Sequence, residues 1–331
     1  MTSVRIACAQ IAPAVGDAEG NRRRAREAVR EAIGAGARIV LLPELVTSGY
    51  VFESAEEARA LAQPVVGPAL SDWAEEAERA EAVVLGGFAE LGADGAVYNS
   101  AAVFGPAGPL AVYRKTHLWD REKLCFEPGG EPAPVVETPF GRIGVAVCYD
   151  LYFPELTRGL ALAGADLIAV PANLPLFPRP EGERPVEIAL AQATAHVSKV
   201  WVAVCDRTGP ERGVEWTGAS CIVDPDGWLA AGPVDGYGEG ILYADCDLAL
   251  AREKAWGERN DVRGDMRPEL YPTVRPASDP SRIASSSERG RAGRQPRPLP
   301  EPPARERARD PARARARPPP GQPRARGRRC W

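Results

Sequence analysis

The chain has 331 residues, which allows one large domain or two ordinary ones. From Arg275 to the end it holds 16 arginines and 5 acidic residues, a net charge of +11, whereas the whole chain carries −4, so the first 274 residues carry −15. Such an acidic body argues against nucleic acid or an anionic membrane as the partner of the folded domain.

The seven cysteines do not form a recognisable metal or disulfide pattern. They stand at positions 8, 125, 148, 205, 221, 246 and 330, with no CxxC pair. The N-terminal "MTSVRIACAQ" lacks a basic region followed by an apolar run, so we expect no signal peptide. No stretch approaches the ~18 apolar residues of a membrane span. We therefore expect a cytoplasmic protein with no membrane contact, no metal and no cofactor.

The first third of the chain predicts alternating strands and helices. "SVRIACAQ" and "ARIVLLPEL" are apolar enough for buried strands, the second interrupted by Pro43. Between them, Asn21 is a candidate cap for a helix that runs to about Ala35. Residues 69–80, rich in alanine and glutamate, predict another helix, and "AVVLGGFAE" predicts a third strand.

The same alternation continues to about residue 272. "YNSAAVFG" and "PLAVYRK" predict an antiparallel hairpin across the turn "PAG". "GRIGVAVC" predicts a strand that ends at Cys148, and Pro154 occupies the favoured first position of the next helix. A further helix is predicted over 184–198, between strands at "DLIAVPAN" and "VWVAVCD", and the last strands fall in "GASCIVDPDGWLAA" and "GILYADCDL". About ten strands and four main helices indicate an α/β fold with two mixed sheets packed face to face and helices outside.

Three segments place a reactive side chain directly after a predicted strand. Glu44 follows the apolar run of "LLPEL", Lys115 ends "LAVYRK", and Cys148 ends "GRIGVAVC". Taken singly, they are a solvated glutamate, a surface lysine and a buried structural cysteine. Together they are an acid, an ammonium and a thiol at strand ends, which converge at one edge of an α/β sheet. A carboxylate can take the thiol proton and later activate water, and a nearby ammonium and a helix N-terminus lower a thiol pKa.

These segments resemble the Glu-Lys-Cys signature of the nitrilase superfamily, the carbon–nitrogen hydrolases of linear amides and nitriles. "PELVTSGY", "YRKTHLW" and "CYDLYFPEL" are similar to its glutamate, lysine and cysteine motifs, and "YNSAAVFG", "PFGRIGVAVCYD", "GADLIAVPAN" and "GASCIVDPDG" support them in family order. The resemblance implies an αββα sandwich over residues 1–272, commonly assembled as a homodimer or higher homo-oligomer. It also implies that Glu44, Lys115 and Cys148 are catalytic.

The resemblance implies a second glutamate after the lysine motif. In "EKLCFEPG", Glu122 stands at the family's distance from the Pro-Gly step, whereas Glu127 touches the proline and is expected to form a loop salt bridge. Further candidates for the oxyanion or substrate pocket lie within the matching motifs: Tyr50, Tyr149, Tyr152 and Asn173.

The motif after the cysteine bears on the substrate. "CYD" looks more like the amidase and carbamoylase branches than like true nitrilases, which usually have tryptophan and glutamate there. A small linear amide, cleaved to a carboxylic acid and ammonia, is therefore the first expectation, an N-carbamoyl amine or amino acid the second and a nitrile the third. The helix "AQATAHVSK" departs from the family's Arg-Ala-x-Ala-x-Glu-Asn pattern at Gln192 and His196, which leaves the substrate class open.

Two other functions compete with this one. A papain-like Cys–His pair needs an imidazole, and the chain has only His117 and His196. His117 lies two residues after Lys115 and is expected near the site as scaffold. Residues 273–331, rich in arginine and proline, are predicted to be disordered. They are the basis of a different class of function, an RNA-binding or protein-binding chain with a vestigial hydrolase domain.

Overall fold

Two six-stranded sheets lie face to face at the centre of the fold. The computed structural model describes residues 3–234 and 238–271. In spatial order, the first sheet contains β12 (Gly240–Cys246), β1 (Val4–Gln10), β2 (Ile39–Leu41), β3 (Val83–Leu91), β4 (Val97–Gly105) and β5 (Gly108–Arg114). The second contains β11 (Leu229–Ala231), β10 (Cys221–Val223), β9 (Trp201–Cys205), β8 (Leu167–Pro171), β7 (Gly141–Val145) and β6 (Val135–Thr138).

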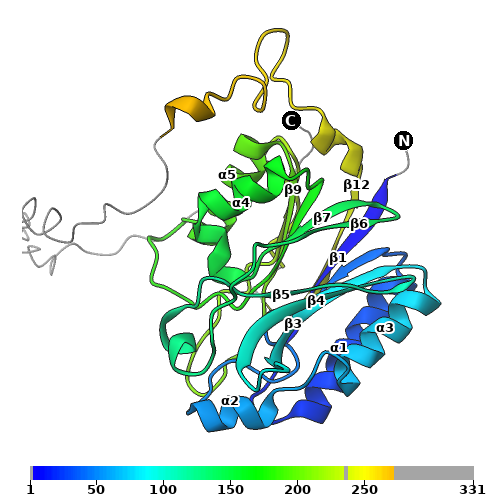
Figure 1. Ribbon diagram of the computed structural model, residues 1–331, viewed down its shortest axis with the longest axis vertical. Coiled ribbons are helices and arrows are strands. Elements are labelled where there is room, and N and C mark those ends of the chain that lie inside the picture. The colour runs from blue at the N-terminus through cyan, green and yellow to red at the C-terminus, as the bar shows by residue number, and fades with distance from the viewer. Residues whose placement is uncertain (1–2, 235–237, 272–331) are drawn as a thin grey trace, which may run out of the picture. The chain divides into compact units, whose positions relative to one another are not determined.

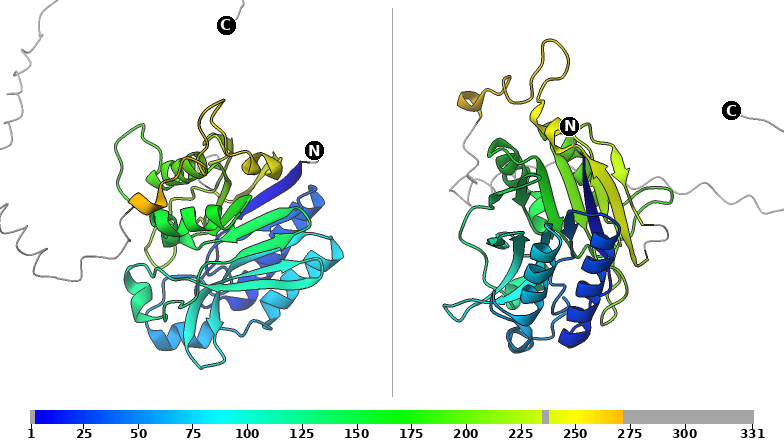
Figure 2. Two further views of the ribbon diagram at one scale, coloured as in Figure 1. Left: turned by 45° about the horizontal axis from the view of Figure 1, so that its top comes forward. Right: turned by 90° about the vertical axis from the view of Figure 1, so that its right-hand side faces the viewer.

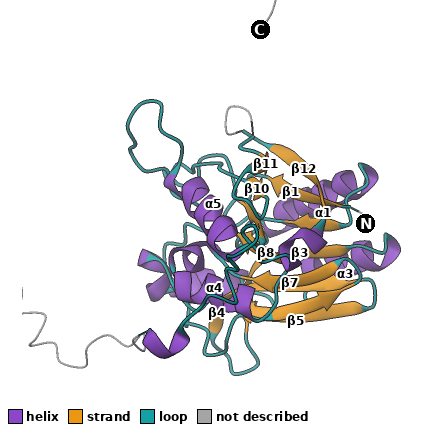
Figure 3. Cartoon of the chain, turned by 90° about the horizontal axis from the view of Figure 1, so that it is seen from above, coloured by secondary structure: helices purple, strands orange, loops and turns teal. Residues whose placement is uncertain are grey.

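Helices cover the outer faces of both sheets. The α-helices are α1 (Ala18–Gly34), α2 (Ala55–Leu61), α3 (Pro68–Arg79), α4 (Pro154–Leu162) and α5 (Val186–Ser198). Short 3₁₀ turns are η1 (Asp120–Leu124), η2 (Cys148–Tyr152), η4 (Leu248–Arg252) and η5 (Pro268–Leu270). Figure 1 shows α1 and α3 on the outside of the first sheet and α4 and α5 on the outside of the second, and Figures 2 and 3 show the same layers from other sides. The expected αββα sandwich is confirmed.

Alternate side chains of a strand pack in two different cores, one between the two sheets and one between the first sheet and its helices. In β1, Ile6 and Cys8 belong to the core between the sheets, together with Val145 and Ile168 of the second sheet. The intervening Ala7 and Ala9 pack instead with Val29 of α1 and Trp73 of α3. Because successive side chains of a strand point to opposite faces, an apolar run without alternation predicts a strand that is buried on both sides.

Several local predictions need correction. The cap of α1 is Asp17, whose side chain accepts from the Gly20 N–H, whereas Asn21 lies inside the helix and bonds the backbone of Ala14. The strand expected to reach Cys148 ends at Val145. Two short elements, α2 and β6, were not expected from the sequence. No helix in the described part of the chain has the length and apolar character of a membrane-crossing segment.

The chain divides into two units, Met1–Arg267 and Pro268–Trp331. The predicted disorder of 273–331 falls on residues outside the described ones. We expect a truncation after Arg275 to keep kcat/KM and melting temperature, because every assigned strand and every candidate catalytic residue precedes that point. Activity assays and thermal melts of both forms, at low and at physiological salt, check this. Loss of activity or unfolding at both salt concentrations would place the tail within the catalytic unit.

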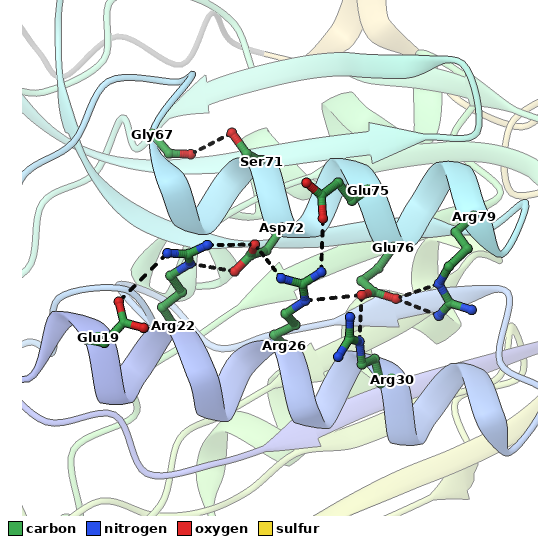
Figure 4. A network of polar contacts seen from close by, with 10 residues as sticks. All are labelled: Glu19, Arg22, Arg26, Arg30, Gly67, Ser71, Asp72, Glu75, Glu76 and Arg79. Carbon is green, nitrogen blue, oxygen red and sulfur yellow. Dashed lines mark hydrogen bonds and ion pairs between the residues drawn. The ribbon is translucent and has the colours of Figure 1, made fainter.

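A charge network joins α1 to α3 across the first helical layer (Figure 4). Arg22 and Arg26 bind Asp72, and Arg26, Arg30 and Arg79 all bind Glu76, whose side chain is only 2% exposed. Burial raises the pKa of Glu76, but hydrogen bonds from Arg79, Arg30 and Arg26 outweigh it, so the pKa lies below its ordinary value. This carboxylate therefore stabilises the fold at neutral pH.

Replacing Glu76 with glutamine should lower the free energy of unfolding at pH 7 by about 1–3 kcal/mol, because charged hydrogen bonds to buried atoms are lost. A group with a lowered folded pKa contributes stability above its unfolded pKa, and that stability disappears as pH falls through the folded pKa. The difference between wild type and variant should thus shrink below about pH 4. Urea unfolding of wild type and variant at pH 7 and below about pH 4 measures this difference in the free energy of unfolding. The control is Glu75→Gln, since Glu75 is 64% exposed and pairs only with Arg26 among the described residues.

Candidate active site

Three strand ends bring the predicted acid, ammonium and thiol together. Glu44 follows β2 after Leu42 and Pro43, and Lys115 directly follows β5. Cys148 comes after β7 and opens the 3₁₀ turn η2. All three residues are buried, and the charges of Glu44 and Lys115 both act on the thiol of Cys148, so the three groups form one buried cluster.

Lys115 is the centre of this cluster. Its side chain is fully buried, and its Nζ donates to Glu44 Oε1 at 2.7 Å and to Glu122 Oε1 at 2.8 Å. Burial lowers the pKa of Lys115, but the negative charges of Glu122 and Glu44 outweigh it and raise the pKa well above its ordinary value. The ammonium therefore stays charged, shared between two carboxylates.

Glu44 has the properties of a general base. Its Oε1 also accepts from Asn99 Nδ2 at 2.8 Å, whereas its buried Oε2 has no hydrogen-bond partner among the described residues. Burial raises the pKa of Glu44 to about 7, with Lys115 opposing the rise. A carboxylate with a pKa near neutrality and an unoccupied oxygen can accept a proton at physiological pH.

Cys148 is held in a backbone conformation that few side chains adopt. Its φ is +47°, in the left-handed region, and the residue is 5% exposed. Its Sγ donates to the carbonyl of Asn173 at 3.6 Å. Burial and the charge of Glu44 raise the pKa of Cys148 well above its ordinary value, although Lys115 acts in the opposite direction. Lys115 therefore lowers the thiol pKa, as expected, but burial outweighs the ammonium and the pKa lies above its ordinary value.

Asn173 joins the turn that carries Cys148 to the loop that carries Glu44. Its carbonyl accepts from Cys148, and its Nδ2 donates to the carbonyl of Glu44 at 2.9 Å. The next residue, Leu174, donates its N–H to the buried carboxylate of Asp206 at 2.9 Å. Asn173 thus contacts Cys148 through its backbone carbonyl and the Glu44 backbone through its side-chain amide. Its own Oδ1 is buried without a partner in the described part of the chain.

Glu122 links the cluster to two aromatic residues, Tyr50 and Trp119. Its Oε1 accepts from the hydroxyl of Tyr50 as well as from Lys115, and its Oε2 accepts from the Trp119 N–H at 3.2 Å. Glu127, by contrast, is exposed and forms no ion pair among the described residues, so the expected loop salt bridge is absent there. Of the two glutamates, Glu122 is the one in the cluster.

His117 is a scaffold residue, as expected. Its Nδ1 lies 2.7 Å from Asp150 Oδ1, and its ring stacks on Phe153 with centroids 3.6 Å apart. Asp150 also accepts from the Tyr113 hydroxyl and from the N–H of Val147. The imidazole therefore holds the turn that carries Cys148 in place through Asp150 and Phe153.

A cavity of about 290 Å³ opens beside Glu122. This volume lies near the lower end of the ~300–1,000 Å³ typical of small-molecule sites. Most of its wall is apolar or aromatic, and its lining residues are Tyr50, Val51, Phe52, Trp119, Asp120, Arg121, Glu122, Cys125, Phe126, Pro175, Phe177, Val214 and Trp216. Such a wall fits a small ligand with an apolar group.

Of the four pocket candidates, only Tyr50 lines this cavity. Tyr149 contacts Trp119 edge to face with centroids 4.8 Å apart, and the Tyr152 hydroxyl donates to Glu187 at 2.8 Å. Asn173 lies by Cys148 instead. Sequence reasoning missed the aromatic wall, above all Trp119 and Trp216, because aromatic residues scattered along a chain carry no spacing signal.

The atypical helix packs against a turn away from the cavity. Gln192 Nε2 donates to the Gly227 carbonyl at 2.7 Å, and His196 Nδ1 lies 2.7 Å from the Asp226 carbonyl. Gly227 has a φ of +89°, and a Cβ there would lie 3.0 Å from His196 Cβ. These two departures from the family pattern therefore anchor the 224–228 turn.

The family assignment follows from comparison with known proteins. A model of the carbon–nitrogen hydrolases matches residues 5–255, which include the whole cluster. The chain belongs to the carbon–nitrogen hydrolase family. A nitrilase from Pyrococcus abyssi is 37% identical over 271 residues, 81% of this chain and 99% of that protein. An N-carbamoylputrescine amidase from Arabidopsis thaliana is 32% identical over 291 residues, 82% and 93% of the two chains.

Solved structures of carbon–nitrogen hydrolases share the fold. An amidase from Nesterenkonia sp. has a TM-score of 0.64 and 28% identity, covering 76% of this chain and 93% of that one. Saccharomyces cerevisiae Nit3, a nitrilase-superfamily member, has a TM-score of 0.66 and 26% identity, covering 76% and 92%. One structure of the Nesterenkonia amidase carries acrylamide added at its active-site cysteine. The resemblance to the nitrilase superfamily is confirmed.

Proposed function

We propose that this carbon–nitrogen hydrolase cleaves small linear amides through a thioester on Cys148. The observation that supports this best is the geometry of Lys115, whose buried ammonium lies within 2.8 Å of two carboxylates and acts on the neighbouring thiol. That arrangement supplies a nucleophile, a base and a positive charge in one buried site, which is what acyl transfer requires.

In the acylation step, Glu44 takes the proton of Cys148 Sγ as the sulfur bonds to the amide carbon. Lys115 opposes the negative charge that develops on the amide oxygen. The carbon–nitrogen bond then breaks, the proton passes from Glu44 to the leaving nitrogen, and ammonia departs. Because burial raises the pKa of Cys148, the thiol holds its proton until the sulfur attacks, and proton transfer to Glu44 accompanies that attack.

In the second step, Glu44 removes a proton from water, which attacks the thioester carbon. The carbon–sulfur bond breaks, the acid is released, and Cys148 recovers its proton from Glu44. Glu122 keeps Lys115 oriented in both steps, since it accepts from Nζ at 2.8 Å and is itself held by Tyr50 and by the Trp119 N–H.

The cavity supports an amide as the first choice of substrate. It is small and mostly apolar, so a short neutral acyl group fits better than a charged one. An N-carbamoyl amine or amino acid is the alternative, in line with the similarity to an N-carbamoylputrescine amidase, and a nitrile is third, in line with the similarity to a nitrilase. The homo-oligomer implied by the family resemblance stays a prediction.

Ammonia release from a panel of compounds tests the proposal. Purified protein should act on aliphatic amides from propionamide to hexanamide faster than on N-carbamoyl amines, N-carbamoyl amino acids or matched nitriles. Mass spectrometry of acid-quenched enzyme should show the acyl group on the peptide that contains Cys148. Turnover without an acyl adduct, or turnover of nitriles only, would contradict the proposal.

The pH profile should report Glu44. Because only the ionised carboxylate accepts the thiol proton, kcat/KM should rise through a single titration at about pH 7. Lys115, with its raised pKa, stays protonated across that range. An amide without ionisable groups ensures that the titration belongs to the enzyme. A profile that is flat between about pH 5 and 8 would remove Glu44 from the role of base.

A further inference from the structure

A second buried ion pair lies outside the cluster around Cys148. Arg207, which follows β9, is fully buried, and its Nη1 lies 3.0 Å from Glu211 Oε2. Its Nη2 donates to the carbonyl of Pro13. Removing a guanidinium from water is costly, and a hydrophobic replacement is often as stable as a buried pair. The contacts of the pair therefore indicate what it does.

Glu211 holds the loop that carries Tyr50. Its Oε2 accepts from the N–H of Tyr50 at 2.9 Å and of Val51 at 2.8 Å, and its Oε1 accepts from the N–H of Val15 at 3.0 Å. The approach is so close that a Cβ on Gly49 would lie 2.6 Å from Glu211 Oε1. The carboxylate thereby sets the position of Tyr50, which lines the cavity and bonds Glu122.

Arg207 holds the adjacent part of the same wall, Trp216. Its guanidinium lies over the ring of Trp216, 4.6 Å from the centroid. Trp216 meets Tyr50 edge to face, with centroids 5.2 Å apart, and both rings line the cavity. The Trp216 Nε1 has no hydrogen-bond partner among the described residues, so packing against Arg207 and Tyr50 fixes the indole.

We propose that Arg207 is a positioning residue for substrate selection. Through Glu211 and Trp216 it fixes the aromatic wall, and so determines the size of the acyl group that the cavity admits. The group selected is short, neutral and apolar. This inference rests on the proposed amide hydrolysis for the identity of the ligand, but the rigidity of the wall is measurable without turnover.

Alkylation of Cys148 provides that measurement. Iodoacetamide and N-benzyl iodoacetamide both form a sulfur–carbon bond with loss of iodide, and they differ in size. Peptide mass spectrometry gives the rate at Cys148 separately from that at Cys125, the half-buried thiol of the cavity wall. Glu122 lines the cavity and its charge acts on Cys148, so we expect reagents to approach the thiol through the cavity. The ratio of the N-benzyl iodoacetamide rate to the iodoacetamide rate at Cys148 then reports how strictly the cavity excludes bulk.

Arg207→Met alone leaves Glu211 buried without its cation, so the main variant is Arg207→Met with Glu211→Gln, and Arg207→Lys is the conservative variant. In the double variant, the rate ratio should change about tenfold or more, as when one contact of an apolar pocket is lost, while the iodoacetamide rate stays within about threefold. Arg207→Lys should fall between. Melting temperatures establish that all forms are folded.

Lys199→Met is the matched control. Lys199 also pairs with a carboxylate, Asp226, and lies over an indole, that of Trp256, 4.4 Å from the centroid, but Trp256 is not part of the cavity. The ratio of the two alkylation rates at Cys148 in Lys199→Met should equal that of wild type. Arg207→Lys and Trp216→Ala should also be non-additive, because Arg207 acts through Trp216. An unchanged ratio in the Arg207 variants, or additive effects, would overturn the inference.

Amide turnover adds a second measurement. In the double variant, KM for butyramide should rise by about tenfold with kcat within about threefold, since contacts to the acyl group are weakened and those to the reacting carbon are kept. If the wild type hydrolyses no amide, the proposed function fails while the alkylation ratio still decides the role of Arg207. If amides are hydrolysed and the ratio is unchanged, the inference about Arg207 alone fails.

Discussion

Cys148→Ala should abolish amide hydrolysis, and Cys148→Ser should lose at least ~10³-fold in kcat/KM, because serine is far the weaker nucleophile here. The alanine variant should fold, because Cys148 contributes only one weak hydrogen bond, to Asn173. The φ of +47° at this position is no harder for alanine to adopt than for cysteine. Ammonia release and melting temperature are the measurements. Residual activity near that of wild type would refute covalent catalysis at this position.

A second buried cysteine separates loss of the nucleophile from loss of a core thiol. Cys246 on β12 is fully buried and its Sγ donates to the carbonyl of Ala244. Cys246→Ala should lower the melting temperature modestly and leave kcat/KM within about twofold, because small cavities in the core affect stability and not the reacting groups. Equal losses of activity in the two alanine variants would point to a packing effect instead of catalysis.

Lys115→Ala should reduce kcat by about 10²–10³, the usual cost of removing a donor that opposes charge in the transition state. Its loss also leaves Glu44 and Glu122 buried without a cation. Because Lys115 opposes the rise in the pKa of Glu44, that pKa should rise further and Glu44 should cease to be a base at neutral pH. Rapid-quench mass spectrometry of the thioester measures acylation directly.

The matched control for Lys115 is Lys123→Ala, because Lys123 is exposed on η1 and keeps the net charge change the same. Acylation by that variant should match wild type. If Lys115→Ala acylated as fast as Lys123→Ala, the ammonium would have no part in the chemical step. The proposed role of Glu122 in orienting Lys115 would then also be wrong.

Much of the fold was predictable because apolar runs and breakers are local signals. The strand at Leu167–Pro171 is an uninterrupted apolar run, the strand at Val4–Gln10 contains the apolar run from Ile6 to Ala9, and the helix at Pro154 opens on a proline. The N-terminus of α1 was not predictable, since Asp17 and Asn21 are both good caps and the choice between them depends on the bonds that Asn21 makes with Ala14.

The cluster was predictable for a different reason. Glu44, Lys115 and Cys148 each follow a strand and lie within ordered motifs, so their convergence could be inferred from topology. The sign of the thiol pKa shift could not, because burial of Cys148 and the charge of Glu44 are properties of the folded site. The contacts of Arg207 and Glu211 behind the wall could not be predicted either, since a guanidinium over the Trp216 ring and three backbone N–H donors to one carboxylate leave no periodic pattern in the sequence.

One ammonium shared by two carboxylates has a consequence for the end of the catalytic cycle. With Glu44 ionised, the buried cluster of Glu44, Glu122 and Lys115 carries one unbalanced negative charge. A neutral amide enters such a site without electrostatic penalty, whereas the acid formed from it in the proposed reaction is an anion. At low local dielectric, like charges a few ångströms apart repel strongly. We therefore expect the acid to leave as it loses its proton, and its carboxylate to be a poor inhibitor of the next turnover.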